Sequence, residues 1–243
     1  PSYGKKIELW IPYPQSNKVQ NISDIIIETD MDYLIKKEQK HGNKYLYIYN
    51  EDGLEKSTNI SMTFIVTRKE HSNEHYSGVD PDNYLGSYAT VPTGEIFSSI
   101  IEENKLSKDN IRAIYEFVYD GMHYGKPKSI ESEYYEDPWL NADSSYGAKR
   151  VSRDKVVELY QKSIEESNNY TFGNGNSIYA CNIGVGNCTD YHSYFMSIGR
   201  TLDIPVRFHM GFLLPLSEKG EINGYHCWAD FFIEDEGWYP VDI

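Results

Sequence analysis

The sequence of 243 residues contains no run of about 18 apolar residues, the length that a membrane-spanning helix requires. We therefore expect no transmembrane helix. A basic stripe is also missing, since 37 acidic and 23 basic side chains give a formal net charge of -14. Because this charge repels phosphate groups, the sequence predicts no nucleic-acid partner and no anionic-membrane partner.

The chain has few cysteines and none of the common metal-binding motifs. Its three cysteines are an odd number, so at least one lies outside any disulfide within the chain. Neither a CxxC pair nor an HExxH motif occurs, which argues against a zinc site built from Cys181, Cys188, Cys227 and His226. The acidic stretch ESEYYED, residues 131–137, lacks the ligand pattern and the glycine of an EF-hand loop, so we interpret it as a solvated loop. We expect no metal and no cofactor.

The first third of the chain has the pattern of short β-strands. Turn signals such as His41-Gly42-Asn43 separate five β-rich runs: IELWI, SDIIIET, DYLIKKE, KYLYIY and ISMTFIVTR. The pattern predicts an N-terminal all-β domain, an antiparallel sheet or sandwich, at residues 1–92. Nothing in it forms a catalytic constellation, so a structural or binding role is predicted.

After this region the apolar residues recur with the period of a helix. The stretch NIRAIYEFVYDGM, residues 110–122, places its apolar residues on one helical face. A second amphipathic helix is predicted at residues 153–166, with Ser152 as its N-cap. Residues 124–172 around it form an unusually long connection, which we interpret as an insertion, and long loops of this kind are often functional.

The stretch GVGNCTDYHSYF, residues 184–195, predicts the start of a further helix. Asn187 is the expected N-cap, and Asp190 at the third helical position complements the free backbone amides. Cys188 is then the first helical residue, at the tip of an apolar stripe that continues from Tyr191. Pro205 marks the end of the helix.

Strand patterns return after Pro205, in VRFHMGFLL, YHCWADFFI and WYPVDI. Helices followed by antiparallel strands predict an α+β domain at residues 93–243, with helices packed on an antiparallel sheet.

A thiol attacks as the thiolate, which a helix N-terminus and a neighbouring imidazole both favour. Cys188 has the predicted helix N-terminus. His226 opens a strand, and Asp242 follows on the next strand, so a hairpin could hold the imidazole against the carboxylate. His192, one helical turn after Cys188, is an alternative base without an evident third group. Each of these residues taken alone also fits a purely structural role.

Side-chain alternation tests the pairing of His226 with Asp242. For the two to lie directly opposite one another, the hairpin must pivot on Glu234, with an odd-length loop or a bulge. A two-residue turn on Asp235-Glu236 would instead set Asp242 opposite Ala229, on the wrong face.

Several of these motifs resemble one protein family. GNCTDYHSYF, IPVRFHMGFLLP, GYHCWADFF and GWYPVDI resemble the transglutaminase-like superfamily, specifically its bacterial exported, cysteine-protease-like branch. The upstream IYACNIGVGNC resembles the same branch, and WIPYP resembles the β-rich module that often precedes the core. The resemblance spans residues 108–243 with a gap. It implies a papain-related core that carries a Cys-His-Asp triad: Cys188, His226 and Asp242.

The resemblance also implies a mechanism. His226 would accept the thiol proton, and Cys188 would attack a carboxamide or peptide carbonyl to form a thioester. Asp242 would hold the imidazole tautomer, and the backbone amide of Cys188 is an expected oxyanion donor, with the second donor unassigned. The glycines of the motif, including Gly186, are expected to leave room for the substrate.

Three functions remain open from the sequence. We favour a thiol-dependent protease or amidase acting on a protein or peptide, including a cell-wall peptide, because the resembled branch is protease-like. The alternatives are a protein-glutamine transglutaminase with an amine acceptor and a non-catalytic binding or scaffold protein that retains the fold. The resemblance implies a location outside the cytoplasm, which is compatible with a chain that begins at Pro1 rather than Met.

Overall fold

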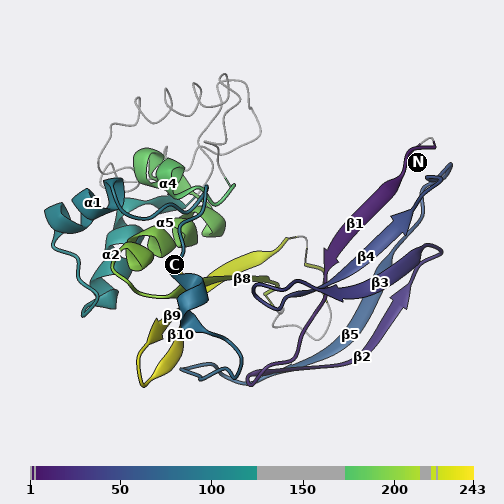
Figure 1. The fold of residues 1–243 in the computed structure, drawn as a ribbon, viewed down its shortest axis with the longest axis horizontal. Coiled ribbons are helices and arrows are strands. Elements are labelled where there is room, and N and C mark those ends of the chain that lie inside the picture. Colours follow the sequence, from purple (N-terminus) through teal and green to yellow (C-terminus); the bar gives the residue numbers. More distant parts are fainter. Residues whose placement is uncertain (1, 3, 125–172, 214–219, 223) are drawn as a thin grey trace. The chain divides into compact units, whose positions relative to one another are not determined.

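The computed structural model describes residue 2 and residues 4–124, 173–213, 220–222 and 224–243. The chain divides into two compact units, Pro1–Val79 and Asp80–Ile243 (Figure 1). Residues 80–92, which the sequence analysis placed with the N-terminal domain, belong to the second unit, and Val91 lies in its hydrophobic core. The helix expected at residues 153–166 and the connection from residue 125 to 172 lie outside the described residues.

The first unit is built of antiparallel strands. They form a three-stranded sheet of order β1-β4-β3 and a two-stranded sheet of β2 and β5 (Figure 1). Leu46 and Ile48 alternate along the central strand and are fully buried, with Met31 against them. The all-β character predicted from the sequence is confirmed. The strands are β1 (Ile7–Pro12), β2 (Gln20–Glu28), β3 (Asp32–Lys37), β4 (Lys44–Asn50) and β5 (Ser61–Arg68).

The second unit combines helices with an antiparallel sheet of order β10-β9-β8, as the sequence predicts for an α+β domain. A short parallel pair, β6 and β7, joins the segments before and after the residues that are not described. The elements are η1 (Pro81–Tyr84), α1 (Ile96–Asn104), α2 (Ile111–Gly121), β6 (His123–Tyr124), α4 (Ser177–Ile183), β7 (Val185–Gly186), α5 (Cys188–Thr201), β8 (Val206–Gly211), β9 (His226–Ile233) and β10 (Gly237–Val241).

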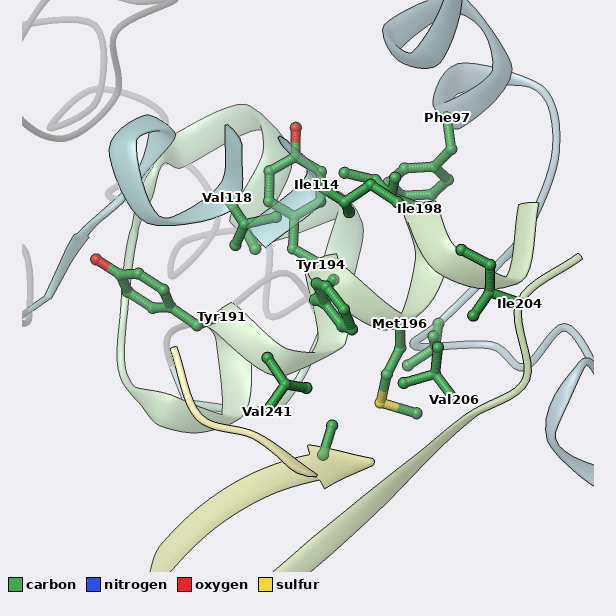
Figure 2. Close-up of a cluster of buried hydrophobic side chains, with 14 of the residues drawn as sticks. Phe97, Ile114, Val118, Tyr191, Tyr194, Met196, Ile198, Ile204, Val206 and Val241 are labelled. Carbon is green, nitrogen blue, oxygen red and sulfur yellow. The ribbon is translucent and has the colours of Figure 1, made fainter. Parts of the chain in front are cut away.

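Helix α2 forms where the sequence predicts it. The side chain of Asn110 caps its N-terminus by accepting a hydrogen bond from the Ala113 amide at 3.1 Å. Ile114 and Val118, one turn apart, are fully buried against α5 (Figure 2). Burying side chains of this size contributes about 1.5–3 kcal/mol each.

Helix α5 is the centre of the second unit. It packs against α1, α2 and α4 and against the sheet, and its apolar side chains, Tyr194 and Ile198 among them, lie in the hydrophobic cluster (Figure 2). Most of its polar side chains are buried as well. Those polar groups are paired: the Arg200 guanidinium donates to the carbonyl oxygens of Val206 and Gly86. Gly199 allows the chain to approach closely, because a Cβ there would lie 2.9 Å from Cγ2 of Val206. The helix is therefore held rigidly, and so is the residue at its first position.

Candidate active site

Cys188 begins α5 and is buried, with 5% of its surface exposed. The capping predicted from the sequence is present: Asn187 Oδ1 accepts from the Thr189 amide at 3.0 Å, and Asp190 Oδ2 accepts from the Asn187 amide at 3.1 Å. This reciprocal cap fixes the first turn of the helix. The thiol therefore sits at the positive end of a helix dipole in a defined position.

Asp190 does more than cap the helix. Its carboxylate also accepts hydrogen bonds from the amides of Gly173 at 2.8 Å and Gly175 at 3.2 Å, so it ties the preceding loop to the first turn of α5. The side chain is fully buried. Burial raises the pKa of Asp190 to about 6, against the opposing effect of the three amide donors. The loop and the cysteine position thus share one buried anchor.

The Asp190 side chain packs directly against the backbone of Gly186. A Cβ at Gly186 would lie 2.5 Å from Cβ of Asp190, which is too close for any side chain. The neighbouring Gly184 ends α4 with a φ of 69°, in the left-handed region that favours glycine. The close packing of Asp190 therefore requires glycine at position 186, and the expectation that the motif's glycines leave room for substrate stays a prediction.

Replacing Asp190 by asparagine is expected to destabilise the second unit. The new amide group keeps one oxygen but turns an NH2 towards backbone amides, leaving at least one buried donor without an acceptor, which costs about 1–3 kcal/mol. Urea unfolding at pH 7 measures the loss. Asp120→Asn on the exposed face of α2 is the matched control and should change stability by less than about 0.5 kcal/mol. Equal stability of the two variants would contradict the anchoring role.

His192 lies one helical turn after Cys188, and backbone groups engage both nitrogens of its ring. Nδ1 of His192 is 2.6 Å from the carbonyl oxygen of Cys188, and Nε2 is 3.2 Å from the amide nitrogen of Ile243. Since the Ile243 amide donates, Nε2 must accept and Nδ1 must carry the proton. Burial lowers the pKa of His192, which favours this neutral form. His192 therefore links the first turn of α5 to the chain beside Asp242.

The hairpin of β9 and β10 has the odd-length loop that a pairing of His226 with Asp242 requires. Gly237 pairs with Ile233, so three residues form the loop, and Asp235 within it adopts a φ of 65°. The hairpin thus turns about Asp235. The observed register is neither the pivot on Glu234 nor the two-residue turn on Asp235-Glu236.

This register still brings the two residues to one face. Val241 pairs with Ala229, so extending the register by one residue sets Asp242 opposite Trp228. Trp228 and His226 are two apart on β9 and share a face, which makes Asp242 a diagonal neighbour of His226. His226 Nε2 lies 2.8 Å from Asp242 Oδ2. The expected contact is made diagonally rather than directly across the ladder.

Cys188 lies beside the residue that follows His226. The buried thiol of Cys227 contacts Thr189 Oγ1 at 3.4 Å, and burial raises the pKa of Cys227 to about 11, with the Cys188 thiol acting in the same direction. Within the described residues no hydrogen bond joins Cys188 Sγ to the His226 ring. Among the described residues, none of the three cysteines forms a disulfide. The structure therefore joins His226 to Asp242 and places Cys188 next to the start of β9.

A buried ionic cluster supports the face of the sheet that carries His226. The Arg207 guanidinium donates to Asp230 Oδ2 at 2.7 and 3.0 Å, and His209 Nε2 lies 2.9 Å from the same oxygen. Trp228 stacks between the rings of His209, at 5.4 Å, and His226, at 6.4 Å. Sequence reasoning missed this cluster because Asp230 lies 23 positions from Arg207 and 21 from His209, on the neighbouring strand, and no local pattern joins them.

The described residues contain neither a metal-binding cluster nor a membrane-spanning helix. No cluster there holds three or more His, Cys, Asp or Glu side chains arranged to bind a metal ion. Of the helices that the structure describes, none has the length and apolar character needed to cross a membrane.

Comparison with known proteins gives one family match. Residues 140–243 match the family model described as the transglutaminase-like superfamily. An uncharacterised protein of Haemophilus influenzae is 24% identical over 261 aligned positions, which cover 96% of this chain. The chain spans 62% of the length of that relative.

Two solved structures are similar to this chain. A candidate cysteine protease from Cytophaga hutchinsonii superposes with a TM-score of 0.60 at 13% identity, covering 98% of this chain and 71% of that one. The periplasmic domain of TgpA from Pseudomonas aeruginosa gives a TM-score of 0.38 at 12% identity, covering 96% of this chain and 71% of that one. The first of these likenesses establishes the fold.

Proposed function

Because residues 140–243 match the family model of the transglutaminase-like superfamily, we propose that the protein is a thiol-dependent hydrolase of peptide or carboxamide bonds. Cys188 is the nucleophile, His226 the general base and Asp242 the residue that orients the imidazole. The observation that carries this proposal is the 2.8 Å contact between His226 Nε2 and Asp242 Oδ2, formed beside the N-terminus of α5. The rigid capping of that helix supports the role of Cys188.

In this proposal the two nitrogens of the His226 ring have different roles. Since Nε2 donates to Asp242, Nδ1 is the nitrogen that takes the thiol proton. Cys188 Sγ then attacks the carbonyl carbon, and the resulting oxyanion is stabilised by the Cys188 amide at the helix N-terminus. The imidazolium returns its proton to the leaving amine as the C–N bond breaks. Water, activated by the same imidazole, hydrolyses the thioester and regenerates the thiol.

Water is the proposed acceptor because the motifs around Cys188 and His226 resemble the cysteine-protease-like branch of the superfamily. An amine acceptor would instead make the protein a transglutaminase through the same thioester. Action on cell-wall peptides and a location outside the cytoplasm belong to this proposal as its expected setting.

Product analysis tests the choice of acceptor. The protein is incubated with a peptide library that includes peptidoglycan stem peptides, with and without monodansylcadaverine, and the products are identified by mass spectrometry. Cleaved peptides are expected to exceed dansylated ones, and Cys188→Ala is expected to give neither. Dansylated products in excess would replace hydrolysis by transglutamination. Products that persist in Cys188→Ala would contradict the thiol mechanism, and a wild type without products would favour the scaffold alternative.

A further inference from the structure

Tyr124 lies beside the nucleophile although 64 positions separate them in the sequence (188 − 124). Strand β6 runs parallel to β7, and the register pairs Tyr124 with Gly186, two residues before Cys188. The Tyr124 ring packs on the Tyr191 ring, with centroids 5.8 Å apart. Tyr191 is buried in the first turns of α5, so the Tyr124 ring is held against the same turn that presents the thiol.

The phenol oxygen of Tyr124 is near two groups of Cys188. Burial raises the pKa of Tyr124, the Cys188 thiol raises it further, and the backbone amide of Cys188 acts against this by donating towards the phenol oxygen. That amide is one of the helix-start donors that lack a partner within the helix. It is also the amide that stabilises the oxyanion in the proposed mechanism. The phenol oxygen of the resting protein thus lies near the place where the oxyanion forms.

Tyr124 is also accessible, since 60% of its surface is exposed. A phenol hydroxyl can donate a hydrogen bond as well as accept one. When a carbonyl oxygen enters the site, the hydroxyl can turn from accepting the Cys188 amide to donating to that oxygen. The ring does not need to leave Tyr191 for this exchange.

We propose that Tyr124 is the second oxyanion donor of the active site, acting together with the backbone amide of Cys188. This inference rests on the proposed function. As Cys188 Sγ bonds to the carbonyl carbon, the π electron pair moves to the carbonyl oxygen, and the thiol proton moves to His226. The Tyr124 hydroxyl donates a hydrogen bond to that oxyanion without transferring its proton. When the leaving group departs, the carbonyl re-forms and the hydrogen bond weakens.

Two reagents separate this role from thiol activation. p-Nitrophenyl acetate acylates a thiol through a tetrahedral oxyanion, whereas iodoacetamide alkylates it at a saturated carbon without one. In Tyr124→Phe, which keeps the ring on Tyr191, acylation of Cys188 is expected to slow by about 100-fold, the effect of losing one oxyanion donor. Iodoacetamide labelling of Cys188, measured by mass spectrometry on the same sample, should change less than about threefold and reports that the site is intact.

Tyr119→Phe is the matched control. Tyr119 is an exposed tyrosine of α2, and its loss of a hydroxyl should leave both rates of the wild type unchanged. Equal slowing of acylation and alkylation in Tyr124→Phe would show that Tyr124 only positions or activates the thiol, and would overturn the proposal. Unchanged acylation would also overturn it. A wild type in which Cys188 reacts with neither reagent would instead contradict the proposed function itself.

Discussion

Hydrolysis is expected to disappear in Cys188→Ala and to fall by at least about 10³-fold in His226→Ala, as kcat/KM, because general-base activation alone contributes about 10²–10⁴-fold. Without the thiol no thioester forms. Without the imidazole the thiol keeps its proton, and the leaving amine loses its proton donor. The measurement is the initial rate of cleavage on the best peptide found in the library.

The controls use residues of the same types outside the site. Cys181→Ala and His75→Ala should retain the wild-type rate, since His75 is an exposed residue of the first unit and Cys181 lies in α4. Rates equal to the wild type in Cys188→Ala would contradict the assignment of the nucleophile. A decrease in His226→Ala of less than about tenfold would remove His226 as the base.

Arg207→Met is expected to destabilise the second unit by about 3–5 kcal/mol, because it leaves the buried Asp230 carboxylate without its cation. The Asp230 side chain is only 2% exposed, and its Oδ1 atom has no hydrogen-bond partner among the described residues. Burial alone would raise the pKa of Asp230, but His209 and Arg207 together lower it to about 2. The folded protein therefore depends on this charge pair. Urea unfolding at pH 7 measures the loss.

The pH dependence and a double variant test the cause. A lowered pKa contributes stability above the ordinary value of 3.8, and this contribution is lost as the pH falls towards about 2. The deficit of Arg207→Met should therefore shrink as the pH is lowered through this window. Arg207→Met combined with Asp230→Leu removes both charges and should be less destabilised than Arg207→Met alone. A deficit that is constant with pH and shared by the double variant would indicate lost packing instead.

Local patterns in the sequence were enough to predict much of the fold. The five strands of the first unit follow from alternation and turn residues, α2 follows from apolar periodicity, and α5 follows from apolar periodicity with Asn187 as its cap. Helix α4 was not predicted, because its seven residues span two turns and show no periodicity. The sequence placed the boundary between the units after residue 92, whereas the structure has it after Val79. Residues 80–92 carry few regular elements, and their placement depends on contacts with distant residues.

The candidate site shows the same limit. Asn187, Cys188 and Asp190 could be placed because a helix start has a local signature. The hairpin register could not, because it depends on three loop residues with Asp235 in a left-handed conformation, which a sequence of this type signals weakly. Tyr124 carried no local signal at all. Its place beside Gly186, two residues before Cys188, results from a parallel strand pair between distant segments.

The most direct test of the central claim is the rate at which iodoacetamide labels each cysteine at pH 7, in the wild type and in His226→Ala. The three cysteines, none of which forms a disulfide among the described residues, serve as mutual references within one sample. Cys188 is expected to react fastest in the wild type, with Cys227, whose pKa is raised to about 11, nearly inert. In His226→Ala the rate at Cys188 alone should fall by at least about tenfold. A Cys188 that reacts no faster than Cys181, or whose rate is the same without His226, would contradict a catalytic Cys188–His226 pair.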